Sequence, residues 1–227
     1  MIVGLDTAGP VIGVGLLTTE RCLTRVERVS RGSETRLIPW LMELCEEAAV
    51  DLSEIQGIAV AQGPGAFTGL RVGLATAVGL AMSLEVPVLP IMSLHSRAER
   101  VFSTLAEPRK PVLSMLDARK GRVYAALYGP DGERLQGPLD VEPRLACGWS
   151  ADPFVATGEG SVVYRKWVEE AQGALVPGAE DPAVDRLCEL GWRRLRQGQG
   201  CDPLESKPVY LRAPDAKPPS RSPFGGL

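Results

Sequence analysis

The sequence predicts an α/β protein made of two lobes that share one architecture. Residues 1–100 follow the order strand, strand, strand, helix, strand, helix, strand, which suits three antiparallel strands extended by parallel ones. An apolar strand that ends in aspartate occurs twice, at Asp6 and at Asp117, and each aspartate is followed ten residues later by a leucine that closes a second strand. The repeated pattern indicates two ribonuclease-H-like lobes, as in the actin, Hsp70 and sugar-kinase superfamily; the alternative is a chance match between two ordinary hairpins.

Length and composition allow this architecture. The chain has 227 residues, of which 44% are hydrophobic and 23% charged, as expected for a globular protein with a real core. Its formal net charge of -3 gives no strong field for attracting nucleic acid or an anionic membrane. We expect an N-terminal lobe over 1–100, a smaller second lobe over 101–213 that includes the C-terminal helix, and a flexible tail over 214–227.

Cysteine usage and hydropathy suggest a compartment. The five cysteines form an odd count without a CxxC motif, which favours free thiols in a reducing cytosol over a disulfide framework. The N-terminus lacks the basic segment of a signal peptide. The longest uncharged helical run, Val72 to Leu84, has 13 residues, too few to span a bilayer. We therefore expect a cytoplasmic protein that does not enter a membrane.

The first-lobe elements follow from periodicity. Segments 2–6 and 11–18 are apolar strands, and 21–29 alternates apolar with polar residues, as a strand with one wet face does. Segment 33–49 has apolar residues at helical spacing. Two further apolar strands are predicted over 57–61 and 86–91, with a second helix between them.

The second half is less regular. Residues 101–110 suggest a junction, and the hairpin around Asp117 follows it. A short strand is expected within 152–160 and a helix over 161–172. A last helix is expected to open with Asp181 as N-cap and Pro182 as its first residue.

Three glycines between strand 57–61 and the next helix raise the question of a phosphate-binding loop. A P-loop requires lysine after its last glycine, whereas Leu70 follows Gly69. A dinucleotide fingerprint requires GxGxxG, and here the third glycine comes one residue too late. The segment therefore predicts a tight strand-to-helix turn, in which Gly63 and Gly65 allow positive φ and Phe67 anchors the loop in apolar surroundings.

The helix after this loop is apolar nearly all round, since Arg71 is its only charged residue before Glu85. Small residues recur every four positions along it, so another helix could approach closely. Such a helix must be covered on most sides, either as an internal core helix or by a partner. We predict that it packs beside helix 33–49 and that the two form a partner interface. The predicted interface residues are Leu37, Trp40, Leu41, Leu44, Gly69, Arg71, Gly73, Ala77, Leu80 and Ala81.

These segments resemble the TsaB (YeaZ) family. "GPGAFTGLRVGLATAVGLA" is similar to that family's GPGSFTGLR signature, and "MIVGLDTA", "LDARKGRVYAALY" (116–128) and "PVYLR" (208–212) are similar to its other recurrent segments. The match is dense up to about residue 130. Ala66 departs from the pattern, which has serine there, and the histidine often seen before the first helix is missing.

The resemblance implies a non-catalytic subunit of the complex that makes N6-threonylcarbamoyladenosine in tRNA. In that system TsaB pairs with its homologue TsaD, which holds the metal and transfers the threonylcarbamoyl group, and the small ATPase TsaE joins the pair. The resemblance thus implies a TsaD-like and a TsaE-like partner, tRNA as substrate of the complex, and a possible homodimer when the chain is alone. Older usage calls the family glycoprotease-like.

The residues favour a chain without catalytic or metal-binding residues of its own. A metal site like that of the catalytic relative needs two histidines one helical turn apart, and His95 is the only histidine. Asp6 and Asp117 stand where the ATP-binding hairpins of the superfamily carry carboxylates. The turns after them have one glycine each and leave little room for phosphate, so they are candidates for a vestigial nucleotide cleft. ATP and metal are expected on the partner subunits.

Two alternatives from other classes remain open. The chain could be a small ATP-dependent kinase or ATPase of the same superfamily, or a self-associating scaffold that uses the same helices for a homodimer. ATP turnover by the pure chain would favour the first, and its size with and without the partner tests the second.

Overall fold

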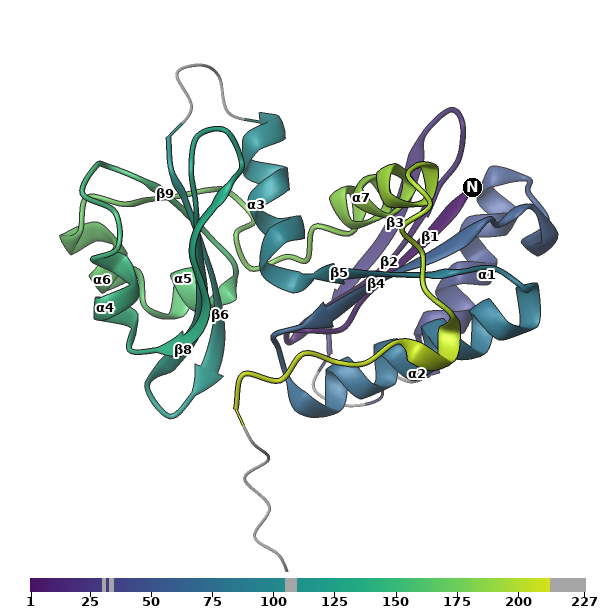
Figure 1. Ribbon diagram of the computed structural model, residues 1–227, viewed down its shortest axis with the longest axis horizontal. Coiled ribbons are helices and arrows are strands. Elements are labelled where there is room, and N and C mark those ends of the chain that lie inside the picture. The colour runs from purple at the N-terminus through teal and green to yellow at the C-terminus, as the bar shows by residue number, and fades with distance from the viewer. Residues whose placement is uncertain (30–31, 33–34, 105–109, 213–227) are drawn as a thin grey trace, which may run out of the picture.

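The computed structural model describes residues 1–29, 32, 35–104 and 110–212. The expected tail over 214–227 and the expected start of the first helix at Ser33 lie outside these residues. Figure 1 shows two α/β lobes side by side, each built around one sheet.

The first sheet has the strand order β3-β2-β1-β4-β5. β1 pairs with β2, and β2 with β3, in antiparallel fashion, whereas β1–β4 and β4–β5 are parallel. The central strands are buried on both faces and are accordingly almost wholly apolar, while the edge strand β3 alternates. The strands span Ile2–Asp6 (β1), Val11–Leu17 (β2), Cys22–Arg28 (β3), Gly57–Gly63 (β4) and Val88–Met92 (β5).

The second sheet repeats this topology. Its order is β10-β9-β6-β7-β8, with antiparallel β6–β7 and β7–β8 pairs and parallel β6–β9 and β9–β10 pairs. β6 and β7 therefore correspond to β1 and β2, which confirms the predicted two-lobed α/β fold. The strands span Val112–Arg119 (β6), Arg122–Tyr128 (β7), Arg134–Val141 (β8), Val155–Thr157 (β9) and Ala174–Leu175 (β10).

The helices differ from expectation in several places. Helix α3 (Ser93–Thr104) runs into the segment 101–110 that was expected as a junction, and helix α4 (Pro143–Cys147) was not predicted. The helix expected over 161–172 is two short helices that meet at Tyr164, and the last helix has Ala183 as its N-cap in place of Asp181. The α-helices span Leu37–Ala48 (α1), Phe67–Leu84 (α2), Ser93–Thr104 (α3), Pro143–Cys147 (α4), Glu159–Val163 (α5), Arg165–Glu170 (α6) and Val184–Arg196 (α7), with 3-10 turns at Leu52–Glu54 (η2) and Pro203–Glu205 (η3).

Helix α7 packs on the first sheet, on the face opposite α1 and α2 (Figure 1), although the sequence places it in the second lobe. Glycines of β1 and β2 explain this position. Val184 and Cys188 lie so close to Gly13 and Gly15 that a Cβ on either glycine would overlap their side chains. Because these glycines have no side chains, α7 can pack directly on the strands. The chain therefore returns to the first lobe after forming the second.

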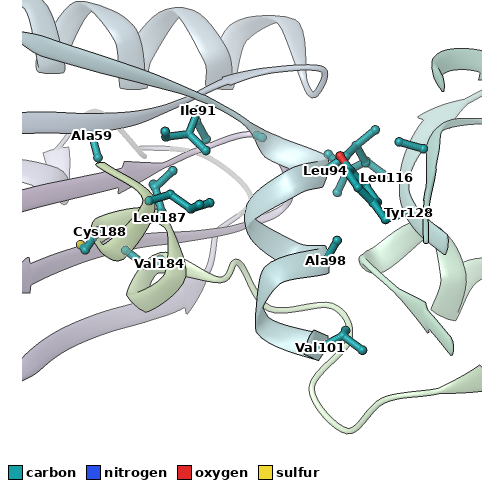
Figure 2. Close-up of a cluster of buried hydrophobic side chains, with 14 of the residues drawn as sticks. Ala59, Ile91, Leu94, Ala98, Val101, Leu116, Tyr128, Val184, Leu187 and Cys188 are labelled. Carbon is teal, nitrogen blue, oxygen red and sulfur yellow. The ribbon is translucent and has the colours of Figure 1, made fainter. Parts of the chain in front are cut away.

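Helix α3 joins the two lobes through one continuous core. Figure 2 shows Leu94, Ala98 and Val101 of α3 in a cluster that includes Leu116 and Tyr128 of the second sheet. The same cluster continues to Ala59, Ile91 and Leu187 of the first lobe, as labelled there. The lobes are therefore joined by buried apolar contacts as well as by the chain.

Helix α2 has 18 residues, longer than the 13-residue run read from sequence, and by length and composition alone it could cross a membrane. In the fold one of its sides lies against β4, where Leu70, Leu74 and Ala77 are buried. This packing is that of a core helix with one uncovered side.

Candidate functional site at the lobe junction and on the outer helices

Two glycines of the loop, Gly65 and Gly69, face the chain's own first turn, whereas Gly63 faces Val209 of the C-terminal segment. A Cβ on Gly65 or Gly69 would come closer than 3.0 Å to backbone atoms of Thr7 and Ala8, a distance that real Cβ atoms essentially never show. The Ala66 N–H donates to the Ala8 carbonyl at 2.7 Å, and the Thr7 hydroxyl donates to the Gly69 carbonyl at 2.7 Å. The absence of side chains at Gly65 and Gly69 therefore lets the turn after β1 pack closely against the start of α2.

This packing occupies one of the backbone amides that a phosphate-binding loop would need. The Ala66 N–H, an amide at the N-terminus of α2 that could face an anion, already binds a carbonyl. Gly63 has the expected positive φ of 121°, but Gly65 does not, and its need for glycine comes from the contact with Ala8. Phe67 is half-exposed between Arg71, 3.9 Å from its ring centroid, and Tyr210, so the expected apolar anchor is wrong.

Asp6 ends β1 as predicted and is held by a buried arginine. Its Oδ2 accepts from Nη1 of Arg97 at 2.9 Å, and its Oδ1 accepts from the Ala8 N–H at 2.9 Å. The side chains of Arg97 and Asp6 are 1% and 0% exposed. Arg97 also donates to the Ser93 carbonyl at the start of α3. The charge of Asp6 is therefore neutralised inside the chain.

Asp117 lies at the corresponding place in the second lobe, two residues before the end of β6. Its Oδ1 accepts from the Arg119 N–H at 3.0 Å and from the Tyr164 hydroxyl at 3.4 Å, and the Arg119 guanidinium lies 3.2 Å from Oδ2. Both predicted aspartates thus have arginine partners of their own.

Glu159, which sequence reasoning missed, lies between the two hairpins. It opens α5, is 6% exposed, and both carboxylate oxygens lie 3.4 Å from where a Cβ on Gly9 would be. Oε1 accepts a long hydrogen bond of 3.4 Å from the Asp117 N–H. Burial raises the pKa of Glu159 to about 7, although nearby Arg97 acts in the opposite direction.

A signal for Glu159 existed in the duplication. β9 corresponds to β4, so Gly158 to Gly160 corresponds to the glycine loop of the first lobe. As Gly65 does against Ala8, Gly160 lies close against the backbone of β6. A charged residue between two such glycines therefore predicts a side chain at the junction of the two lobes.

Several groups that a metal–nucleotide site would use are engaged within the chain, although Arg119 beside Asp117 is 77% exposed. Both predicted aspartates have arginine partners and the N-terminus of α2 has given an amide to Ala8. Within the described part of the chain, no three His, Cys, Asp or Glu side chains are placed to hold a metal ion.

The predicted partner residues are mostly inside the fold. α1 and α2 share one face of the first sheet, and their inward side chains form a common core with it. Arg71 alone of the predicted set is exposed, and Gly69 and Leu80 are half-buried. The prediction is wrong for the seven buried residues, because they cover the chain's own sheet: Leu37, Trp40, Leu41, Leu44, Gly73, Ala77 and Ala81.

The opposite sides of these helices carry uncovered apolar residues. Ile38 and Met42 of α1 are 41% and 48% exposed, and Met82 of α2 is 54% exposed. Ala75 and Gly79 are also exposed on α2. We call these five residues the outer helix face.

The C-terminal segment runs from α2 to the second lobe (Figure 1). The Val209 N–H donates to the Gln62 carbonyl at 2.7 Å, and Arg71 donates from Nε to the Tyr210 hydroxyl at 3.1 Å. Arg212 binds Asp140 of β8 at 2.7 Å. A shallow groove of about 480 Å³ lies between this segment and α2.

Comparisons with known proteins agree on one family. The family TsaD, tRNA N6-adenosine threonylcarbamoyltransferase, matches residues 26–219. The chain is 32% identical to the tRNA threonylcarbamoyladenosine biosynthesis protein TsaB of Haemophilus influenzae, over 93% of each chain. It is 27% identical to the protein of the same name from Escherichia coli, over 93% of this chain and 94% of that one.

Solved structures give the same result. The structure of YeaZ from Pseudomonas aeruginosa superposes with a TM-score of 0.75 at 32% identity, covering 92% of this chain and 99% of that one. The fold repeats one sheet topology, and its glycine loop packs on the first turn. Because the chain is also similar to these relatives over nearly its full length, it belongs to the TsaB (YeaZ) family.

Proposed function

We propose that this chain is a non-catalytic, cytoplasmic subunit in the synthesis of N6-threonylcarbamoyladenosine in tRNA. It pairs with a homologous TsaD-like subunit, a TsaE-like ATPase joins the pair, and tRNA is the substrate of the complex. The names of its relatives support the pathway. The observation that supports the pairing is the outer helix face, the exposed apolar residues on two helices that cover the same face of the first sheet.

The chemistry of the outer helix face suits a helical partner. Flexible methionines fill irregular gaps between helices, so Met42 and Met82 can adapt to a neighbour. Ala75 and Gly79 leave room for another helix to approach closely. A homologous subunit has equivalent helices, so pairing would be pseudo-symmetric, with α1 and α2 facing their counterparts.

The non-catalytic assignment is supported by the junction. An ATP-binding cleft needs carboxylates free to take a metal and backbone amides free to take phosphate. Here Asp6 binds Arg97, Asp117 binds Arg119, and the Ala66 amide binds Ala8. We infer that ATP and metal bind to the partner subunits.

The purified chain should hydrolyse no ATP above the buffer rate, because its candidate carboxylates are already engaged. Phosphate release with ATP and Mg²⁺ measures this. Turnover that co-purifies with the chain and is lost in Asp117→Asn would instead support the small-ATPase alternative.

Met82→Glu should weaken binding to the TsaD-like subunit by about 10–100-fold, because a carboxylate would be buried without a partner. Met82 is 54% exposed in the free chain, so the melting temperature should stay near that of the wild type. Titration calorimetry with the TsaD-like subunit of the same organism measures the affinity.

Leu145→Glu is the matched control. Leu145 is 61% exposed on α4 of the second lobe, away from the outer helix face, so its replacement should leave affinity unchanged. Equal loss of affinity in both variants, or none in Met82→Glu, would refute this interface.

The homodimer alternative uses the same surface. If the free chain self-associates through the outer helix face, Met82→Glu should make it monomeric, and the TsaD-like subunit should convert the wild-type homodimer to a heterodimer. Light scattering with and without that subunit distinguishes a scaffold, whose homodimer persists, from a subunit whose homodimer is exchanged.

A further inference from the structure

Glu159 connects the second lobe to the turn of the first. It is the first residue of α5, and its carboxylate lies against Gly9, which belongs to the turn between β1 and β2. The contact lies beside the buried Asp6–Arg97 pair and the backbone of Asp117. The same carboxylate therefore touches both hairpins of the duplicated fold.

The hydrogen bonds of this carboxylate are poorly satisfied. Oε2 of Glu159 has no hydrogen-bond partner among the described residues, and the carboxylate accepts only from backbone N–H groups, that of Asp117 at a long 3.4 Å and its own. Arg97 directs Nη1 to Asp6 and to the Ser93 carbonyl, and its buried Nε also has no described partner. The guanidinium that lies near Glu159 is thus bound to another carboxylate.

The charges around Glu159 favour its neutral form. Asp6 from β1 and Arg97 from α3 cancel each other, so an ionised Glu159 would leave one uncompensated negative charge in a buried place. On β6, Asp117 is held by Arg119 and by Tyr164, which precedes α6.

The remaining neighbours supply no compensation. β9 has the sequence Val-Ala-Thr and brings no titratable side chain. On α6, Arg165 and Lys166 form exposed ion pairs with Glu169 and Glu170. The described elements packed around α5 therefore offer Glu159 no second cation.

We propose that Glu159 is a proton-operated latch between the two lobes: protonated, it closes the junction against the Gly9 turn, and ionised, it draws water in and loosens that contact. The apolar contacts of α3 would remain as the hinge, because they do not involve Glu159. The inference does not depend on the proposed role in tRNA modification, because it concerns the isolated chain.

The direction of the pH effect follows from linkage. A carboxyl whose pKa is raised by folding binds its proton more tightly in the folded chain, so it stabilises the closed form at low pH and opposes it as pH rises. With a pKa of about 7 against 4.5 for an ordinary glutamate, the folded chain holds this proton about 300-fold more tightly. The effect grows from about pH 4.5 and is complete above about pH 7.

The full-length chain tests this directly. Carboxyl-carbon NMR should show one glutamate, absent from Glu159→Gln, that titrates near pH 7. Hydrogen-exchange protection of residues 7–9 and 116–118 should fall about tenfold between pH 6 and pH 8 after correction for intrinsic rates. Glu159→Gln keeps the shape of the protonated side chain, so its protection should be independent of pH over this range.

Glu169→Gln on the neighbouring helix is the control and should behave as the wild type, because Glu169 is exposed and its ion pair with Arg165 is exposed as well. A Glu159 carbon that titrates near 4.5 would overturn the proposal. So would wild-type and Glu159→Gln chains with the same pH dependence of exchange. The NMR titration uses the wild-type fold and does not depend on any variant being stable.

Discussion

Gly69→Ala should destabilise the folded chain by about 3 kcal/mol, whereas Gly79→Ala in the same helix should stabilise it by up to about 1 kcal/mol. The methyl group at position 69 would overlap the Thr7 carbonyl oxygen, a backbone atom that cannot rotate away. At position 79 no atom lies within 4 Å of the added methyl, so only the helix preference of alanine counts. Denaturant unfolding of both variants measures the difference.

These two variants distinguish two possible roles of the glycines in α2. If both glycines were needed only for contact with a partner, both alanine variants should fold equally well. Similar unfolding free energies for Gly69→Ala and Gly79→Ala would contradict the seating of the first turn on α2. Partner affinity provides a second comparison, since Gly79 lies on the outer helix face and a methyl group there should reduce the affinity by holding the partner helix further away.

The sequence could not predict which side of α2 faces the sheet. A helix that is apolar nearly all round has no polar side to mark its outside, so periodicity cannot say which stripe faces the sheet. Gly73, Ala77 and Ala81 were predicted to contact a partner, but in the fold they are buried. A bulky residue at Gly73 would meet the Thr7 side chain, so we expect it to unfold the chain before it affects any partner.

The lobes themselves were predictable, because strand order and the two aspartate hairpins repeat along the chain. Local patterns carry this information: each hairpin is formed by residues close in sequence. The return of α7 to the first lobe was not predictable in the same way. It depends on Gly4, Gly13 and Gly15 forming one bed across two strands, which no single segment reveals.

The junction charges were hidden for a related reason. Asp6 and Arg97 are 91 residues apart, and Glu159 reaches them from a third part of the chain. A lone arginine on a predicted helix is normally assigned to solvent, and only the tertiary fold shows that this one is buried. The two aspartates could be proposed from their strand ends, but the groups that neutralise them could not.

Arg97→Met should cost about 3–5 kcal/mol of unfolding free energy, because it leaves Asp6 buried beside Glu159 without a cation. Methionine fills much of the same volume, so the loss reports the missing charge more than a cavity. Denaturant unfolding at pH 7 measures it. Arg193→Met, which removes the exposed partner of Glu99 on α3, should cost at most about 1 kcal/mol.

The double variant Asp6→Asn with Arg97→Met should recover most of this loss, because it removes both charges while the asparagine oxygen still accepts from the Ala8 N–H. In Arg97→Met alone, Glu159 should ionise at a higher pH than in the wild type, since Arg97 lowers its pKa. If Arg97→Met is as stable as the wild type, Asp6 has another cation or water to bind. The Asp6 carboxylate would then be available to other ligands, and the junction would be open to a metal–nucleotide complex.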